Sequence, residues 1–533
     1  MTQELTDLLE TGVQHHQRGD LATAEAYYRQ VLALAPEHPD ALHLLGLIAQ
    51  SNADLALAET HIRRALTARP QEAMFHYNLA NVLRDAGRFD DAIASYRTAL
   101  RLRPDDADTL LNLGGALAAQ GDPRAAVECY RTLLRQTPRH LSALLSLGQV
   151  LSTIGQDSEA RVVYQTTLDI EPDHYEAHLG LAVLSQEAGK ESDAQHHYQA
   201  ALRANPNFAP AWNNFGTWHQ ERGDRAAAAE CYRRALTLDA EDARAYNNLG
   251  ALLAEEDRAA EAEACYQAAL QLRPQFAEAH KNRAAVLQAL GRHDEALASL
   301  REALRLQPDF PEAAYKLAAL SGERPPASAP AEYVAALFDG YAKDYEQHLT
   351  STLRYQVPQA LFELWTQTVP GAKDLDVLDL GCGTGLSGAV LRPCARQLIG
   401  IDLSPRMLAL ARERAIYDRL LEGDIVQLLA QERAQFDLAC AADVFVYIGD
   451  LEAVMASLAR SLRPGAYLMF SVEALETGEY RLQPTGRYAH ASGYLEGLAG
   501  RHGFEPRAQR QMTLRVEQGR PVSGRLQVWR RQP

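Results

Sequence analysis

The sequence is poor in cysteine for its length, and the cysteines it has are scattered. Six cysteines occur among 533 residues, and none of them forms a C-x-x-C pair. A structural zinc site or a disulfide framework needs clustered or regularly spaced cysteines. We therefore expect reduced thiols, no metal site and a cytoplasmic protein.

Long apolar runs and an excess of basic residues are also missing. No run approaches the roughly 18 residues of a membrane-spanning helix. The N-terminal MTQELTDLLETG has neither the basic nor the apolar stretch of a signal peptide, so we do not expect secretion. Acidic residues outnumber Lys and Arg by 69 to 53, giving a net charge of −16. Proteins that bind nucleic acid usually carry a basic surface. We therefore expect neither a membrane nor nucleic acid as a partner.

A period of 34 residues fills the first 310 residues. Prolines stand at 36, 70, 104, 138, 172, 206, 274 and 308, and Ala240 occupies the equivalent position between Pro206 and Pro274. An alanine lies twelve residues before each of these nine positions, a glycine or alanine lies 24 before, and a tyrosine lies eight before in seven units. This pattern predicts two helices that cross closely at the small residues, with the proline ending the second. One pair cannot cover its own apolar face, so the nine units should stack into a solenoid.

This pattern resembles the tetratricopeptide repeat. The resemblance implies a superhelix over residues 1–320, with a capping helix from Pro311 and a groove for a protein or peptide partner. In that family the residue 26 before the proline position faces the inner wall of the superhelix. Asparagine, whose amide is able to pair with a peptide main chain, occupies that position at Asn78, Asn112, Asn214, Asn248 and Asn282. The alternative is that these amides satisfy local polar groups.

A different pattern follows residues 321–331, a Pro- and Ser-rich stretch that reads as a linker. VLDLGCGTG, residues 377–385, is an apolar strand with one acid, Asp379, followed by three glycines at alternate positions. A strand, a glycine turn and a helix open a nucleotide-binding doubly wound sheet. The spacing differs from the dinucleotide G-x-G-x-x-G, and Asp379 suits a ligand with a positive centre. A second strand, 397–402, ends in Asp402, which is able to accept hydrogen bonds from ribose hydroxyls.

Together with three further segments, these motifs resemble the class I S-adenosylmethionine-dependent methyltransferases. GIDLSPRML (400–408) is similar to the ribose-binding segment, and EGDI (422–425) is similar to the adenine-contacting turn. FDLACAADVFVYIGD (436–450) resembles strand four with the loop beneath the methyl group, and LRPGAYLMFSVE (462–473) resembles the turn into strand five. The resemblance implies S-adenosylmethionine as cofactor, bound by Asp379, Gly381, Cys382, Gly383, Gly385, Asp402, Leu403, Asp424, Ile425 and Ala441. For Asp424, the alternative is a plain helix N-cap.

The family's α/β Rossmann-like domain, with a seven-stranded sheet, should occupy residues 332–533 and be self-contained. We predict helices at 386–392, 405–416, 451–462 and 488–501, and strands at 397–402, 419–422, 436–441, 467–472, 506–516 and 524–531. Helical periodicity precedes the sheet over 333–365. Tyr341 and Tyr345 lie four residues apart there and suit the methionine end of the cofactor, or simple helix docking.

Residues on the acceptor side follow from the topology, because open α/β sheets bind substrate beyond the carboxyl ends of their strands. Asp443, Tyr447 and Glu473 lie there. His490, in the expected helix start after strand five, is the best candidate base at neutral pH, with Tyr447 as a second catalytic candidate. An ordinary capping or surface role is the alternative for His490.

Two classes of function remain open from the sequence. The first is an S-adenosylmethionine-dependent methyltransferase whose repeats recruit a protein or peptide acceptor, or whose repeats serve assembly while the acceptor is a small molecule. The second is a non-catalytic repeat scaffold with a cofactor-sensing domain. Intact Asp379 and Asp402 favour the first class, since a degenerate domain would be free to lose them.

Overall fold

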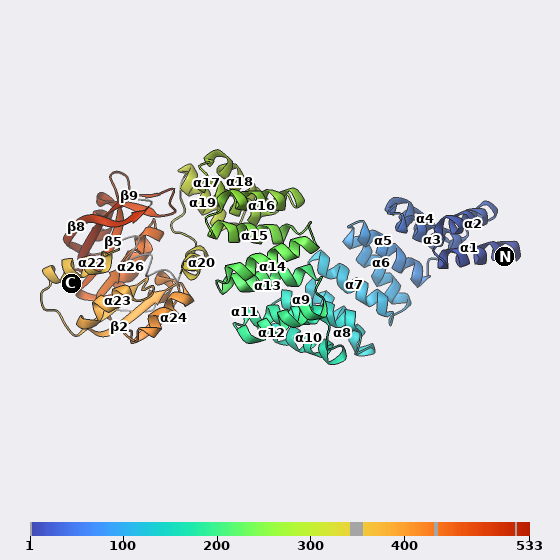
Figure 1. Cartoon of the computed structure of the whole chain (residues 1–533), viewed down its shortest axis with the longest axis horizontal. Helices are drawn as coiled ribbons and strands as arrows, with labels where there is room; N and C mark the ends of the chain where they lie inside the picture. Colours follow the sequence, from blue (N-terminus) through green and yellow to red (C-terminus); the bar gives the residue numbers. More distant parts are fainter. Residues whose placement is uncertain (1–2, 324, 342–354, 431–434, 518–519) are drawn as a thin grey trace. The chain divides into compact units, whose positions relative to one another are not determined.

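The computed structural model describes residues 3–323, 325–341, 355–430, 435–517 and 520–533. The chain forms two compact units, Met1–Ala240 and Glu241–Pro533. Figure 1 labels their helices and strands. The boundary falls inside the repeats, at the unit in which Ala240 replaces the proline. The last two repeats therefore group with the sheet, and the predicted boundary at 320–331 stays a prediction.

The first unit consists of helix pairs. Its helices are α1 Gln3–Gln17, α2 Leu21–Leu34, α3 Pro39–Ser51, α4 Leu55–Ala68, α5 Ala73–Asp85, α6 Phe89–Leu102, α7 Ala107–Gln120, α8 Pro123–Gln136, α9 Leu141–Thr153, α10 Asp157–Ile170, α11 Tyr175–Glu187, α12 Glu191–Ala204, α13 Ala209–Glu221 and α14 Arg225–Leu238. Two further pairs and a capping helix open the second unit: α15 Ala243–Glu255, α16 Ala259–Leu272, α17 Ala277–Ala289, α18 His293–Leu306 and α19 Pro311–Ser321. The predicted solenoid of nine helix pairs is confirmed.

The recurring small residues explain why each pair packs closely. All nine of the recurring alanines, from Ala24 to Ala296, are completely buried. A Cβ atom placed on Gly114 would lie 2.5 Å from Cε1 of Tyr130, so the glycine is needed for the tyrosine ring to fit. The other tyrosines at that position are buried in the same way. The predicted crossing at Gly and Ala, filled by Tyr, is therefore confirmed.

A mixed sheet follows in the second unit, with the order β3-β2-β1-β4-β5-β7-β6 and with β9 antiparallel to both β5 and β8. The strands are β1 Leu375–Leu380, β2 Ala395–Asp402, β3 Arg419–Glu422, β4 Phe436–Ala441, β5 Leu462–Leu475, β6 Tyr480–Leu482, β7 Tyr488–Ala491, β8 Phe504–Glu517 and β9 Arg520–Arg531. The α/β fold is confirmed, with nine strands in the described residues where the sequence predicts seven.

Of the two additional strands, β6 lies in a stretch without a predicted element, and β7 lies where the sequence predicts the start of a helix. Tyr488–Ala491 pairs parallel to the end of β5 and antiparallel to β6, and α27 begins only at Ser492. The helix predicted at 488–501 is therefore wrong over its first four residues. The partners of this short strand come from elsewhere in the sheet and leave no local signal in the sequence.

Helices cover both faces of the sheet. They are α20 Ala331–Tyr341, α22 Val357–Thr368, α23 Leu386–Leu391, α24 Pro405–Glu413, α25 Ile425–Leu429, α26 Glu452–Ser461 and α27 Ser492–Arg501, with one-turn helices η2 Arg392–Cys394 and η3 Phe445–Tyr447. Val377 of β1 packs with Trp365 of α22, whereas its neighbour Leu378 packs with Leu458 of α26. Alternate residues of a strand thus bury themselves against opposite layers. Among the described helices, none is long and apolar enough to cross a membrane.

Candidate active site

The glycine turn lies at the point where the strand order reverses. β1 is flanked by β2 on one side and β4 on the other, and such switch points are the usual ligand sites of open α/β sheets. Gly381 and Gly383 follow β1 with φ of +59° and +52°. A Cβ on Gly381 would lie 2.5 Å from Cγ2 of Val444, so glycine also allows the loop after β4 to approach.

Asp402 ends β2 and ties this turn to the start of α24. Its Oδ2 accepts a hydrogen bond from the Gly383 N–H at 2.8 Å, and its Oδ1 accepts one from the Ser404 N–H at 2.9 Å. Burial raises the pKa of the Asp402 carboxyl, and the backbone donors act against that rise. Each carboxylate oxygen has a further lone pair, so Asp402 is able to accept two more donors from a ligand.

Asp379 lies beneath the glycine turn and is completely buried. Its Oδ2 accepts a hydrogen bond from Tyr417 Oη at 2.6 Å, whereas its Oδ1 has no partner among the described residues. Burial raises the pKa of the Asp379 carboxyl to about 7. A buried carboxylate oxygen without a partner fits a ligand that brings a positive group, as the sequence predicts.

A cavity of about 1480 Å³ opens beside the turn. The predicted cofactor residues that line it are Gly381, Gly383, Asp402, Leu403, Asp424 and Ile425. Asp379, Cys382, Gly385 and Ala441 lie outside this lining. Cys382 donates its N–H to the Ile401 carbonyl, and Gly385 is the N-cap of α23 at φ +93°. The four residues outside the lining therefore shape the turn and the strand ends, whereas the six lining residues face the cavity.

Asp424 caps a helix and also lines the cavity. Its Oδ1 accepts a hydrogen bond from the Gln427 N–H at 3.0 Å, which makes it the N-cap of α25. The same residue lines the cavity, next to Gly423 and Ile425. Capping fixes the side chain at the cavity edge and leaves its second oxygen for a ligand.

Asp443 and Tyr447, which the sequence predicts on the acceptor side, also line the cavity. Asp443 has a left-handed φ of +61°, a strained conformation for a residue with a side chain. Its N–H donates to Ser471 Oγ at 2.8 Å, and its Oδ2 accepts from Arg515 Nη1 at 3.0 Å. Tyr447 packs edge-on against Phe338 of α20, with ring centroids 5.6 Å apart. These contacts hold both side chains at the cavity wall.

Glu473 lies behind this wall. It is buried, pairs with Arg515 and accepts a hydrogen bond from Gln483 Nε2 at 3.0 Å. The sequence gives no sign of Arg515, because β8 reaches the site only through its pairing with β9, which in turn pairs with β5. Arg515 is 2% exposed and bridges Asp443 to Glu473, so it positions both carboxylates.

His490 does not reach the cavity. It is completely buried on β7, and its Nε2 lies 2.9 Å from the Ile448 carbonyl and 3.1 Å from the Gly449 carbonyl. Burial lowers the pKa of the imidazole to about 4, so it is neutral at pH 7. Its Nε2–H donates to both carbonyls and holds the loop after η3 in place. His490 is therefore not placed to act as the base.

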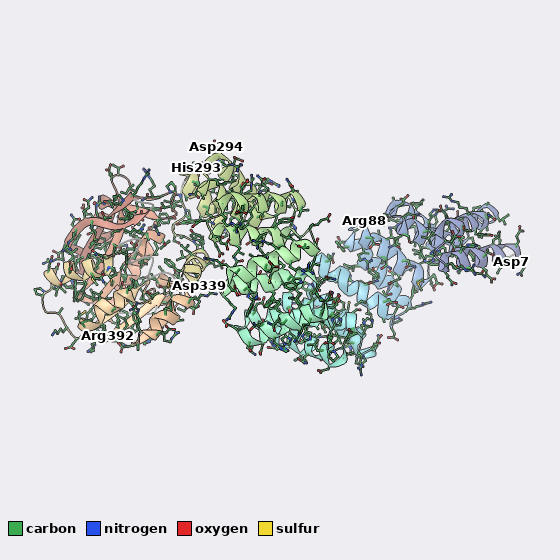
Figure 2. All side chains as sticks on the ribbon, in the orientation of Figure 1. Asp7, Arg88, His293, Asp294, Asp339 and Arg392 are labelled. Carbon is green, nitrogen blue, oxygen red and sulfur yellow. The ribbon has the colours of Figure 1, made fainter. Side chains whose placement is uncertain are left out.

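Helix α20 covers part of the cavity, and Tyr333, Val334, Leu337 and Phe338 line it. Tyr341 is the last residue of α20, and its side chain, like all of Tyr345, lies outside the described residues. Asp339, labelled in Figure 2, accepts hydrogen bonds from Ser404 Oγ and the Arg406 N–H at the start of α24.

Three of the five predicted peptide-binding asparagines pair with the preceding repeat. Asn78 Nδ2 lies 2.7 Å from His43 Nε2, and Asn112 Nδ2 donates to Tyr77 Oη at 2.9 Å. Asn282 Nδ2 donates to Asn247 Oδ1 at 3.1 Å. The local alternative therefore accounts for these amide donors. Peptide binding by the five residues stays a prediction. Within the described ranges, no group of three or more His, Cys, Asp or Glu side chains is placed to hold a metal ion.

Known families match both the repeats and the sheet domain of this chain. A family described as "Methyltransferase domain" matches residues 378–470. Families described as "Tetratricopeptide repeat" match 15–73 and 109–142, and one described as "TPR repeat" matches 80–121. A family described as "Cilia and flagella-associated protein 70 C-terminal domain" matches 139–351.

Curated relatives match the C-terminal part. The malonyl-[acyl-carrier protein] O-methyltransferase of Salmonella typhimurium is 32% identical over 165 residues, which are 30% of this chain and 63% of that protein. The ubiquinone biosynthesis O-methyltransferase of Bordetella pertussis is 27% identical over 168 residues, 28% of this chain and 70% of that protein. The human methyltransferase-like protein 27 is 42% identical over 85 residues, 16% of this chain and 34% of that protein.

Among solved structures, a tetratricopeptide repeat protein from Parabacteroides merdae matches with a TM-score of 0.40 and 18% identity, over 54% of this chain and 99% of that chain. The methyltransferase match contains the glycine turn and Asp402, and the repeat matches contain the recurring alanines and tyrosines. The chain is therefore a fusion of tetratricopeptide repeats with a class I methyltransferase domain.

Proposed function

We propose that this protein transfers a methyl group from S-adenosylmethionine to an acceptor that its repeats recruit, a protein or a peptide. The observation that supports this most directly is the shared cavity. Gly381, Asp402 and Asp424 line one part of it, and Asp443 and Tyr447 line another. Such an arrangement brings a bound cofactor and an acceptor together without a further conformational assembly.

The cofactor fits the side chains on its side of the cavity. Asp402 would accept hydrogen bonds from the ribose hydroxyls, and Asp424 with Ile425 would meet the adenine edge. Asp379 lies behind this lining, and its unpartnered oxygen would place negative charge beneath the glycine turn for the positive end of the ligand. Bound S-adenosylmethionine would supply a methyl group on a positively charged sulfur, which leaves as a neutral thioether. Positioning then carries most of the catalysis.

An oxygen acceptor is favoured by the names of two relatives, which are both O-methyltransferases. An acceptor hydroxyl must lose its proton, whereas a carboxylate acceptor carries none to lose. In the hydroxyl case Asp443 is the group at the wall that would accept this proton, and Tyr447 would help to orient the acceptor. Arg515 and Ser471 hold Asp443 for this role.

Recruitment of a protein acceptor is favoured by the repeats, which as a class mediate protein interactions, and by the Salmonella relative, whose named substrate is carried on a protein. The ubiquinone biosynthesis relative favours a small-molecule acceptor, with the repeats used for assembly. A repeat scaffold that only senses the cofactor is the third candidate. It is disfavoured because the cavity is lined by the predicted acceptor-side residues Asp443 and Tyr447 as well as by the predicted cofactor residues.

One experiment separates these candidates. The full chain is incubated with S-adenosylmethionine labelled in its methyl group and with a cell extract, and the label is followed into protein and into small molecules. We expect label in the protein fraction, and reduced transfer by an Asp402→Ala variant when the cofactor is limiting. Label in small molecules alone would select the second candidate. Cofactor binding without any transfer would select the scaffold, and NADH binding in place of S-adenosylmethionine would refute the proposal.

A further inference from the structure

The cavity is larger than one ligand needs. Its volume of about 1480 Å³ exceeds the roughly 300–1,000 Å³ of a usual small-molecule pocket. The glycine turn and the ends of β2 and β3 account for one side. The remaining lining comes from η3, α20, α26, the segment before α20 and, unexpectedly for a catalytic cavity, the end of the repeats.

The repeats contribute an apolar wall, which we call the repeat wall. It consists of residues from α18, α19 and the turn between them: Leu304, Phe310, Pro311, Ala314, Leu317 and Ala318. Leu337 and Phe338 of α20 line the same cavity. Ala314 is exposed, and Leu304, Phe310 and Leu317 are only half-buried against the core of the last repeat, so the wall presents apolar surface to the cavity.

Specific contacts hold the repeat wall against the sheet. Tyr315 of α19 is 1% exposed, and its Oη donates to the Gly486 carbonyl at 2.7 Å. Gln288 at the end of α17 donates through Nε2 to the Pro484 carbonyl at 3.0 Å. Both acceptors lie in the turn between β6 and β7. The wall is therefore docked on the element that the sequence did not predict.

Residues 327 and 329 of the predicted linker also contact the sheet domain, at η3 and the loop that follows it. The Ala329 N–H donates to the Tyr447 carbonyl at 2.8 Å, and the Gly449 and Asp450 N–H groups both donate to the Ala327 carbonyl at 2.8 Å. Tyr447 is itself a cavity residue. The segment expected as a simple linker thus fixes the distance between the repeat wall and the acceptor side of the cavity.

The one charged side chain that α19 adds to the lining is already compensated. Glu312 pairs with Lys281 at 2.9 Å and with Lys316 at 2.7 Å. Burial of a ligand charge beside this set would have to break an existing pair, which is costly. An apolar group entering the cavity instead removes surface from water on both sides.

We infer that the repeat wall is part of the acceptor site, and that Phe310, Ala314 and Leu317 hold an apolar, acyl-like or aryl-like portion of the acceptor. This inference rests on the proposed methyl transfer and adds a substrate class to it. The end of the repeat array then selects the acceptor directly, besides any recruitment in a groove.

The test uses Nile red, a neutral apolar dye, on the full chain with S-adenosylhomocysteine added to fill the cofactor side. Ala314→Glu places a charge on the wall at an exposed helix position, so the fold should persist. We expect dye binding to weaken at least tenfold and S-adenosylhomocysteine affinity to stay within twofold. Ala260→Glu, at an exposed position of α16 outside the cavity lining, is the matched control and should change neither.

A second variant protects the test against an unexpected loss of fold. Ala336→Glu charges the α20 side of the same cavity and should weaken the dye in the same way. In the labelled extract, Ala314→Trp should lower methyl transfer at least tenfold, because it fills the acceptor space. Equal dye binding by wild type and both charged variants, or no dye binding by wild type, would overturn the inference. Failure of wild type to bind S-adenosylhomocysteine would instead refute the proposed function.

Discussion

The repeats and the sheet bury their polar side chains in different ways. In the repeats, buried amides pair between neighbouring units, as Asn78 does with His43. Among the described repeat residues, the buried side-chain atoms without a partner are ring nitrogens of His61, His174 and His280. In the sheet domain, the described atoms without a partner are Trp365 Nε1, Thr384 Oγ1, His490 Nδ1 and one carboxylate oxygen each of Asp379 and Asp443. Among the described residues, only the sheet domain leaves carboxylate oxygens without partners, and both carboxylates lie close to the glycine turn or the cavity.

This difference separates stacking from ligand binding. Repeat positions recur in every unit, and each of the three paired asparagines finds its partner 35 positions earlier, in the preceding unit. The sheet has one switch point, and its carboxylates keep unused hydrogen-bonding capacity that a ligand would satisfy. Changes in the repeats should therefore appear mainly in stability, and changes at the strand ends mainly in ligand affinity.

The largest effect should come from cutting between the two regions. A chain that begins at Glu332 loses the two backbone groups that pair with η3 and its following loop, and it loses Tyr315. At about 1 kcal/mol per hydrogen bond and about 2 kcal/mol for the buried ring, it should be roughly 5 kcal/mol less stable than a chain that begins at Glu241. Urea unfolding measures the difference. Equal stability would show that the sheet domain is self-contained from 332, as the sequence predicts.

A pH series should show the cost of the buried acid in the sheet. The unfolded chain releases the Asp379 proton near a pKa of about 3.9, whereas burial raises that pKa to about 7 in the fold. The folded state therefore binds more protons between these values, and stability should fall as pH rises from about 4 to about 7. Relative to Asp379→Asn, wild type should lose on the order of a few kcal/mol over that range.

For Asp418→Asn we expect the opposite change of the stability difference with pH. The Leu398 N–H and Arg392 lower the pKa of the Asp418 carboxyl. Its contribution is therefore present above pH 4 and lost as pH falls through the folded pKa. Free energies of unfolding from urea titrations at several pH values give both differences. A flat difference for Asp379→Asn would remove the burial argument.

Asp402→Ala should weaken S-adenosylmethionine binding by roughly 2–3 kcal/mol, since it removes charge-assisted hydrogen bonds. Isothermal calorimetry measures the change. Glu496→Ala is the control, because this exposed acid of α27 lies outside the cavity lining. Equal affinity of the folded Asp402→Ala variant and wild type would refute the ribose assignment.

A pair of adjacent glycines tests the stacking argument in the repeats. Gly114→Ala would place its Cβ 2.5 Å from the Tyr130 ring, whereas the nearest atom to a Cβ on Gly115 is 3.9 Å away. We expect Gly114→Ala to cost about 1–3 kcal/mol of stability through overpacking. Gly115→Ala should instead gain up to about 1 kcal/mol through helix propensity. Equal thermal unfolding of the two variants would contradict the packing model.

The smallest effect concerns a single asparagine. Asn282→Ala loses the hydrogen bond to Asn247 in the preceding repeat and should lower the free energy of unfolding by about 1 kcal/mol. Urea unfolding measures this value. If Asn282 binds a peptide instead, its replacement should raise the KM for a protein acceptor and leave stability unchanged. That result would show that Asn282 serves binding and not the packing of the repeats.

The sequence by itself determined the helix pairs of the repeats and the glycine turn with its acids. Each of these depends on a pattern within one local unit: the alanine of every repeat, such as Ala24, or the spacing from Asp379 to Asp402. Residues that are close along the chain there are also close in space, so their spacing carries the geometry.

Only the tertiary structure decided which side chains meet at the cavity. Arg515 reaches Asp443 across 72 positions, and Tyr315 reaches Gly486 across 171. The short β7 has no local pattern, and its pairing with β5 and β6 buries His490 instead of exposing it as a base. Such contacts join segments whose sequences carry no sign of each other, because burial and strand pairing are properties of the assembled fold.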